Sequence, residues 1–298
     1  NKQTNTWNLS DASLNSKLEL GSYLGGLFEG DGHIWIPNTS SKKKHNPRFC
    51  ITFHIKDLPL AEKLLEIIEY GFIRKKTKEN ACVLTVSPVK GLKKIISLIN
   101  GKLRTPKIHQ LYSLIEWINK NHNLDIKKLT LNNEGLNQDS WLAGFIDADG
   151  SFNIRHTRLE SGEKRRIGCS LKIEQRKVDP ITNESNKEIL TLIAEYFHTK
   201  LSLRQQSRTN REYFIISASS QRSLRRILDY LENHSLLSSK YLDYKDWAKG
   251  VNLILTNLHY TEDGIAQIDN LKNNMNRNRR EFNWDHLERL EKECHGYQ

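Results

Sequence analysis

Hydrophobic and polar residues form two kinds of block along the chain, and these blocks recur in the same order in each half. Segments that alternate between apolar and polar residues predict β-hairpins, and segments with apolar residues at helical spacing predict helices. In the first half the predicted strands are residues 33–37, 48–55, 71–79 and 81–87, and the predicted helices are 57–69, 89–100 and 107–119. In the second half the predicted strands are 151–159, 165–175, 200–208 and 211–219, and the predicted helices are 186–197, 221–233 and 239–252.

An internal repeat explains this recurrence. The segment LGGLFEGDGHIWI at 24–36 matches LAGFIDADGSFNI at 142–154, a spacing that is too long for a solenoid unit and fits a duplicated domain. We therefore predict an α+β fold built from two αββαββα units. The predicted division is an N-terminal half at 18–128, a linker at 129–138, a C-terminal half at 139–258 and a C-terminal helical extension at 259–298 with helices at 263–276 and 283–293.

The alternation within the predicted strands gives each sheet two different faces. Phe152 and Ile154 fall on one face of their strand, and the polar residues between them fall on the other. In the strand 200–208, Leu201 and Leu203 oppose Ser202, Arg204 and Gln206. A solvated outer face is the simple interpretation of such a pattern. The polar residues are unusually basic in both halves, however, and two such sheets side by side would form a surface suited to a DNA major groove.

Composition supports a polyanionic partner. The chain has 298 residues, with 46 Lys and Arg against 35 Asp and Glu, a net charge of +11. No apolar stretch approaches the length of a membrane span. The four cysteines are widely separated and the histidines lack ligand spacing, so neither a zinc site nor a disulfide framework is indicated. The candidate DNA-binding residues are Trp35, Lys42, Lys43, Lys44, Arg48, Arg74, Lys76, Asn153, Arg155, Arg158, Arg165, Arg204, Gln206 and Arg208.

Each copy of the repeat ends in an acid-X-acid-Gly pattern that suggests metal chemistry. Asp31 and Asp149 precede glycines at predicted helix ends, where the negative end of the helix dipole favours a cation. Small residues upstream, Gly25-Gly26 and Ala143-Gly144, would let the two helices pack closely and bring the two aspartates together. Two adjacent carboxylates repel each other, and Mg²⁺ is a natural compensation. A single acid before a glycine is usually only a helix end, but duplication favours the metal site.

These segments resemble the LAGLIDADG motif of homing endonucleases in their single-chain, two-motif form. The second copy differs from the family name only at Phe145, and the resemblance covers about residues 18–258. It implies a monomeric pseudo-twofold αββαββα fold with both motif helices at the centre and two antiparallel sheets forming a DNA-binding saddle. The implied activity is Mg²⁺-dependent cleavage of both strands of a long asymmetric double-stranded DNA target, leaving short 3′ overhangs. Two or three ions are implied, with Mn²⁺ substituting and Ca²⁺ binding without cleavage.

The resemblance also assigns roles to residues. It implies that Asp31 and Asp149 bind metal with the carbonyls of Gly30 and Ala148, and that Glu29 and Asp147 tie the helices together. Lys107 and Lys240 match the basic residues that the family places near each active site, although a surface lysine at a helix start would look the same. Gln175 matches a glutamine that positions water, whereas the equivalent first-half position holds Phe53, so we expect two chemically unequal sites.

Two other function classes fit the same scaffold. An intron RNA maturase is one alternative, with or without nuclease activity. A DNA-binding regulator is the other, but it ought to have lost one or both aspartates, and both are present. The abundance of Asn, Lys and Ile and the resemblance together suggest a mitochondrial, organelle-encoded protein, with the chloroplast as the alternative.

Overall fold

The computed structural model describes residues 20–38, 45–157, 166–288 and 290. Its first half contains α1 (Leu20–Asp31), β1 (Gly32–Trp35), β2 (Arg48–His54), the 3₁₀ turn η2 (Ile55–Asp57), α2 (Leu58–Ile68), β3 (Phe72–Lys75), β4 (Ala81–Val86), α3 (Val89–Ile99) and α4 (Ile108–His122). Its second half contains α5 (Trp141–Asp149), β5 (Gly150–Thr157), β6 (Arg166–Arg176), α6 (Lys187–Tyr196), β7 (Leu201–Gln205), β8 (Glu212–Ala218), α7 (Gln221–Asn233) and α8 (Lys240–Leu255). The predicted duplicated α+β order is confirmed, and each half closes with the helix predicted at 107–119 or 239–252, here α4 or α8.

Each half forms one antiparallel four-stranded sheet, and the two sheets have the same topology. Their strand orders are β1-β2-β4-β3 and β5-β6-β8-β7. The registers also correspond, because Gly32 pairs with Ile51 and Gly150 pairs with Ile173. Both glycines directly follow the motif aspartates, so each motif helix runs straight into the first strand of its own sheet.

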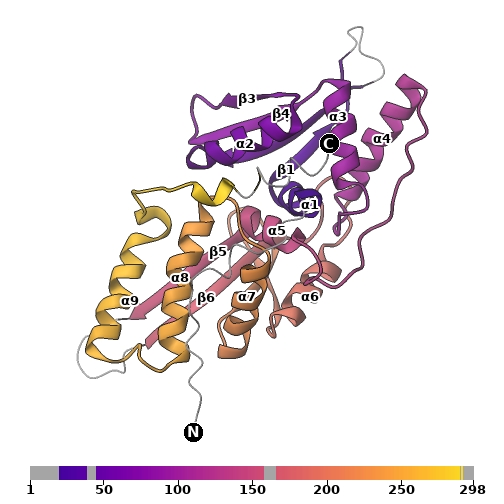
Figure 1. The fold of residues 1–298 in the computed structure, drawn as a ribbon. Helices are drawn as coiled ribbons and strands as arrows, with labels where there is room; N and C mark the ends of the chain where they lie inside the picture. The colour runs from indigo at the N-terminus through magenta and orange to yellow at the C-terminus, as the bar shows by residue number, and fades with distance from the viewer. Residues whose placement is uncertain (1–19, 39–44, 158–165, 289, 291–298) are drawn as a thin grey trace.

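The two motif helices, α1 and α5, pack against each other at the centre of the molecule, between the two sheets (Figure 1). A Cβ atom on Gly26 would lie 1.9 Å from the carbonyl oxygen of Trp141, and one on Gly144 would lie 2.0 Å from that of Tyr23. The small residues therefore allow backbone-to-backbone contact, as predicted. Of the predicted pair Gly25-Gly26, only Gly26 serves this contact, because Gly25 faces Leu103 instead.

The predicted alternation is confirmed in β5, where buried and exposed residues alternate along most of the strand. In β7 the prediction that the apolar residues are buried is wrong, since Leu203 is 54% exposed. β7 is an edge strand of its sheet, so fewer neighbours cover its apolar side chains. Two predicted strands also end early. β3 ends at Lys75 and β7 at Gln205, because the next residues form hairpin turns closed by backbone hydrogen bonds.

The segment after α8 folds back onto the second half. It contains α9 (Glu262–Asn274) and the 3₁₀ turns η3 (Asn276–Asn278) and η4 (Asp285–Glu288). α9 packs on α8 and on β5, the edge strand of its sheet, and His156 Nδ1 lies 2.7 Å from Asp269 Oδ1. The helix predicted at 263–276 is confirmed. In the described part of 283–293, the 3₁₀ turn η4 occupies Asp285–Glu288, where we predicted a regular helix, and Leu290 is helical.

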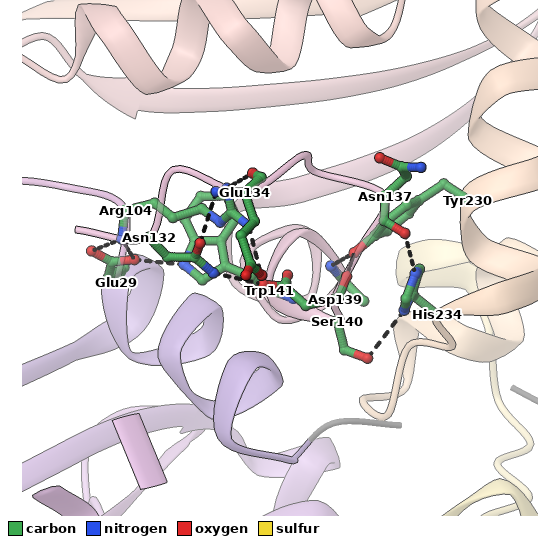
Figure 2. A network of polar contacts seen from close by, with 11 residues as sticks. Glu29, Arg104, Asn132, Glu134, Asn137, Asp139, Ser140, Trp141, Tyr230 and His234 are labelled. Carbon is green, nitrogen blue, oxygen red and sulfur yellow. Dashed lines mark hydrogen bonds and ion pairs between the residues drawn. The ribbon is translucent and has the colours of Figure 1, made fainter. Parts of the chain in front are cut away.

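The predicted linker runs along the first half and meets the start of α5. Asn132 N donates to Leu103 O (2.8 Å), and Arg104 donates to the Glu134 carbonyl (2.6 Å) and to Asp139 Oδ2 (3.0 Å). Figure 2 shows that this network links the end of α1 to the second half. The connection is therefore tied to both halves, while its limits at 129 and 138 stay a prediction.

Candidate active site

Asp31 and Asp149 are the last residues of α1 and α5, as the sequence predicted. The contact between the two helices continues to this end, because a Cβ on Gly30 would meet Ala148 Cβ at 2.1 Å and Asp149 Oδ2 at 3.1 Å. The two aspartates therefore lie at the same end of one tightly packed helix pair, where each half contributes one carboxylate.

Glu29 ties the first motif helix to two other segments. Its buried carboxylate accepts hydrogen bonds from the backbone N–H groups of Arg104 (2.9 Å) and Thr105 (2.6 Å) and from the Thr105 hydroxyl (2.6 Å). The indole N–H of Trp141, on the other motif helix, donates at 2.6 Å. Figure 2 shows Glu29 at the edge of the polar network that extends through the linker.

Asp147 has an equivalent set of partners in the second half. It accepts from the backbone N–H groups of Leu237 (2.7 Å) and Ser238 (3.1 Å) and from the Ser238 hydroxyl (2.5 Å). Tyr23, on the other motif helix, donates its hydroxyl at 2.7 Å. Each acid thus accepts one hydrogen bond across the helix pair, which is the tying role that the resemblance implied.

Lys107 and Lys240 reach the carboxyl ends of the two motif helices. Lys107 Nζ donates to the carbonyls of Phe28 (3.2 Å), Gly30 (3.3 Å) and Gly32 (3.0 Å). Lys240 Nζ donates to those of Ile146 (3.2 Å), Asp147 (2.6 Å) and Ala148 (2.8 Å). These lysines are therefore more than surface residues at helix starts. The two carbonyls predicted as metal ligands already accept an ammonium hydrogen bond, which leaves each oxygen a second lone pair.

Gln175 distinguishes the second half from the first. Its side-chain amide donates to Asp149 Oδ2 at 2.7 Å. Gln175 and Phe53 lie two residues beyond the equivalent register partners Ile173 and Ile51, so the strands confirm that they occupy matching positions. Phe53 is buried and offers no hydrogen bond to Asp31.

The electrostatics of the site reflect two carboxylates held near each other. Burial, and then the charge of Asp31, raise the pKa of Asp149 to about 7. Loss of contact with water also raises the pKa of Asp31, and Lys240 and Lys107 oppose that rise. Asp31 is nevertheless more exposed than Asp149. Burial lowers the pKa of both lysines, and the surrounding carboxylates oppose the change. Burial similarly raises the pKa of Glu29 to about 7.

A divalent cation fits this donor set. Asp31, Asp149 and the neighbouring carbonyls offer oxygen ligands, which Mg²⁺ and Ca²⁺ prefer. A cation would offset the burial and the Asp31 charge that together raise the pKa of Asp149. Within the described residues no three His, Cys, Asp or Glu side chains cluster as a metal site. Water and substrate oxygens would have to complete the coordination.

Two cavities open beside the aspartates, one for each lysine. A cavity of about 320 Å³ is lined by Gly32, Lys107 and Gln175, among others. A cavity of about 490 Å³ is lined by Gly150 and Lys240. Each therefore contains the glycine that follows a motif aspartate and the lysine that precedes or begins the last helix of that half.

The candidate DNA-binding residues separate into several groups. Trp35, Arg48, Arg74, Asn153 and Arg155 are exposed on strands, and the Arg48 guanidinium lies 5.3 Å from the Trp35 ring. Arg204 is also an exposed strand residue and pairs with Glu174 at 3.3 Å. Three candidates lie in hairpin turns instead of on strands, namely Lys76, Gln206 and Arg208. The candidates Lys42, Lys43, Lys44, Arg158 and Arg165 lie outside the described residues.

Sequence reasoning missed several residues that shape the site. Tyr23 and Trp141 are the hydrogen-bond donors that cross the helix pair, and an aromatic residue just before each motif copy was the available signal. Asp57 accepts from Ser239 N at 2.7 Å, so a first-half residue holds the start of α8. No pattern in one sequence pointed to that contact, because it joins residues far apart in the chain.

The fold and the site define a duplicated protein whose shared centre is a pair of aspartates flanked by two lysines. A family model described as LAGLIDADG endonuclease matches residues 24–118 and 142–251. The chain belongs to this family, and the predicted family is confirmed.

Relatives from fungi match across most of the chain. The intron-encoded DNA endonuclease aI3 of Saccharomyces cerevisiae is 30% identical over 90% of this chain and 72% of its own length. An uncharacterized cox1 intron-2 37.2 kDa protein of Schizosaccharomyces pombe is 34% identical over 84% of this chain and 71% of its own. The intron-encoded RNA maturase bI4 of S. cerevisiae is 30% identical over only 48% of this chain and 20% of its own length.

Solved structures share the fold. The I-SmaMI LAGLIDADG homing endonuclease bound to cleaved DNA has a TM-score of 0.69 and 22% identity, covering 89% of this chain and 99% of that one. Another structure of I-SmaMI, bound to uncleaved DNA in the presence of calcium ions, has a TM-score of 0.61 and 22% identity, covering 86% of this chain and 98% of that one. At this identity the likeness establishes the fold, including the predicted pair of sheets.

Proposed function

We propose that this protein is a site-specific DNA endonuclease that cuts both strands of a long asymmetric duplex and leaves short 3′ overhangs. The observation that carries the proposal is the convergence of Asp31 and Asp149, with Lys107 and Lys240, at one end of the central helix pair. One half alone has one aspartate and one lysine, so the single chain supplies the complete site and can act as a monomer.

Mg²⁺ is the proposed cofactor. When bound by Asp31 and Asp149, it would activate water and neutralise charge on the phosphodiester oxygens. Lys107 and Lys240 each donate three hydrogen bonds to carbonyls at the helix ends, so either lysine would exchange one of these for a phosphate oxygen, whose growing negative charge it would stabilise. Gln175 fixes one oxygen of Asp149 at 2.7 Å and can orient a water molecule beside it. The basic strand residues would grip phosphates and read base edges.

The family and the most similar named relatives favour the nuclease over the RNA maturase. Both aspartates are present, and a role limited to binding would not need them. The match to the maturase bI4 covers less than half of this chain. Relatives named for introns, one of them in cox1, support an organellar origin, and we propose the mitochondrion as the compartment.

Cleavage of a randomised double-stranded DNA library tests the function. With Mg²⁺ or Mn²⁺ the chain should cut at one long motif, and with Ca²⁺ it should bind the same motif without cutting. Asp149→Asn should lower the rate at least about 100-fold, since it weakens the metal site. Asp125→Asn is the matched control because this exposed aspartate follows α4, away from the site, and it should cut like the parent chain.

The result that would overturn the proposal is equally definite. If the parent chain cuts no DNA with either metal while an RNA pool is retained with high affinity, the maturase alternative gains support. If Asp149→Asn cuts as fast as the parent, the aspartate pair is not the catalytic centre.

A further inference from the structure

The outer walls of the two active-site cavities are built differently. The first cavity is closed by the loop between β6 and α6, which contributes Val178, Asp179 and Ile181. The equivalent connection in the first half is short, because β2 ends at His54 and α2 begins at Leu58. It contributes only Lys56 to the second cavity. The remaining wall comes from the C-terminal extension, at Lys272 and at Met275 through Asn278.

The extension is attached between the last helix and the first strand of the second half, two elements that contact each other directly in the first half. In the first half, Gln110 accepts a hydrogen bond directly from Ile34 N at the edge of β1 (2.8 Å). In the second half, Asp243 matches Gln110, because each lies three residues after the site lysine of its half. Phe152 likewise matches Ile34, because each lies two residues after the glycine that follows the motif aspartate. Asn276 stands between Asp243 and Phe152, since its N–H donates to Asp243 (2.8 Å) and its side chain donates to Phe152 O (3.0 Å).

A second anchor fixes the far end of the same segment. The guanidinium of Arg279 donates to Asp243 Oδ1 at 2.8 Å and to Asp246 Oδ2 at 2.6 Å. Met275 is buried at the other end. Arg277 lies between these anchors and is exposed, so its backbone position is held while its side chain remains accessible.

The charges in this cavity suit a DNA backbone. Lys56, Lys240, Lys272 and Arg277 all line it. Arg277 forms no ion pair with any residue in the part of the chain that the structure describes. The cavity also borders Ser151 and Asn153, on the exposed polar face of β5.

We propose that the extension segment Met275–Asn278 is part of the second active-site cavity, where Arg277, with Lys56 on the same cavity wall, binds a phosphate of the DNA strand that enters that site. This inference rests on the proposed endonuclease function and extends it to a segment outside the two motif-bearing halves. The extension would then form the outer wall of the second site, as the β6–α6 loop forms the outer wall of the first.

The role of Arg277 is tested by measuring cleavage of each strand separately, on the duplex selected from the randomised library. Each DNA strand carries a different fluorescent end label. The strand that Lys240→Met slows more is assigned to the second site, and the strand that Lys107→Met slows more is assigned to the first. Arg277→Ala should slow the second-site strand roughly five-fold and leave the other strand within about a factor of two. In Ca²⁺, the slope of log affinity against log salt should fall by about 0.9, the value for one lost phosphate contact. Arg277→Lys should retain most of both properties.

Arg280→Ala is the matched control, because Arg280 is exposed three residues after Arg277 but does not line the cavity. It should behave like the parent in strand rates and salt slope. Equal slowing of both strands by Arg277→Ala, an unchanged salt slope, or the same effect from Arg280→Ala would each overturn the inference while the endonuclease function stands. If the parent binds the duplex without cutting it, the salt slope still decides the role of Arg277. If the parent binds no DNA, both proposals fail.

Discussion

The two halves of this protein agree at the centre and differ at the rim of their sites. Both halves place an acid, a lysine and a glycine at equivalent points of the central helix pair. Around this centre, Gln175 occupies the position that matches Phe53, and the β6–α6 loop walls one cavity while the C-terminal extension walls the other. Gly26 and Gly144, which let the helix backbones touch, are the same residue in both copies, while the outer walls of the two cavities differ.

The agreement at the centre is reciprocal. Glu29 accepts a hydrogen bond from Trp141 of the second half, and Asp147 accepts one from Tyr23 of the first. Buried carboxylates need such partners, since an unsatisfied buried charge is costly. Each buried acid accepts its other hydrogen bonds from its own half, and the one from the opposite half couples the site to docking of the halves.

The largest expected effect comes from separating the central helices. Gly144→Ala would place a methyl group 2.0 Å from the Tyr23 carbonyl, so the backbones must move apart. We expect a loss of about 3 kcal/mol or more in the free energy of unfolding, together with loss of cleavage on both strands. Urea denaturation of the metal-free protein measures this change.

A second glycine provides the control for this change. A Cβ on Gly168 meets nothing within 4 Å, so Gly168→Ala should leave stability almost unchanged. Gly26→Ala should match Gly144→Ala, since its Cβ would lie 1.9 Å from the Trp141 carbonyl. If Gly144→Ala were as stable as Gly168→Ala, close packing would not be what aligns the two aspartates.

An intermediate effect is expected from removing the difference between the sites. Gln175→Met keeps the side-chain length and removes the hydrogen bond to Asp149. Gln175 lines the first cavity together with Lys107, so cleavage of the strand assigned to the first site should slow roughly ten-fold, as for one hydrogen bond to a charged group, and the other strand should change little. Single-turnover rates for each labelled strand measure the ratio. Equal slowing of both strands would mean that the two sites do not act separately.

Much of the fold was readable from the sequence because its signals are local. Alternation and helical spacing placed most of the helices and strands, and the repeat gave the duplication. Errors occurred where a neighbour decides the outcome. Leu203 is exposed because β7 lies at a sheet edge, and the strands before residues 76 and 206 end where turns close by hydrogen bonds.

The site was predictable where it lies in the repeat. Asp31, Asp149, Lys107, Lys240 and Gln175 come together as the resemblance implied, although their catalytic roles stay a prediction. The sequence could not place Asp57 beside Ser239, or Asn276 between Asp243 and Phe152. These contacts join segments distant in the chain and follow no period, so only the folded arrangement exposes them.

The smallest expected effect concerns charge at the centre in metal-free protein. Because the folded-state pKa of Asp149 is about 7 against an ordinary value of 3.8, the folded chain binds more protons between these values, and stability falls as pH rises through them. Asp149→Asn lacks this penalty and should be more stable than the parent at pH 8 by about 1 kcal/mol, with the difference gone at pH 4. Asp31→Asn should gain less, since Asp31 is more exposed.

Glu29 also has a raised pKa of about 7, but it contributes equally to all three proteins, so the comparison cancels its effect. Thermal unfolding in a chelator at both pH values measures the difference. Equal stability of Asp149→Asn and the parent at pH 8 would show that the carboxylate pair is not strained, which removes the electrostatic reason for a cation there.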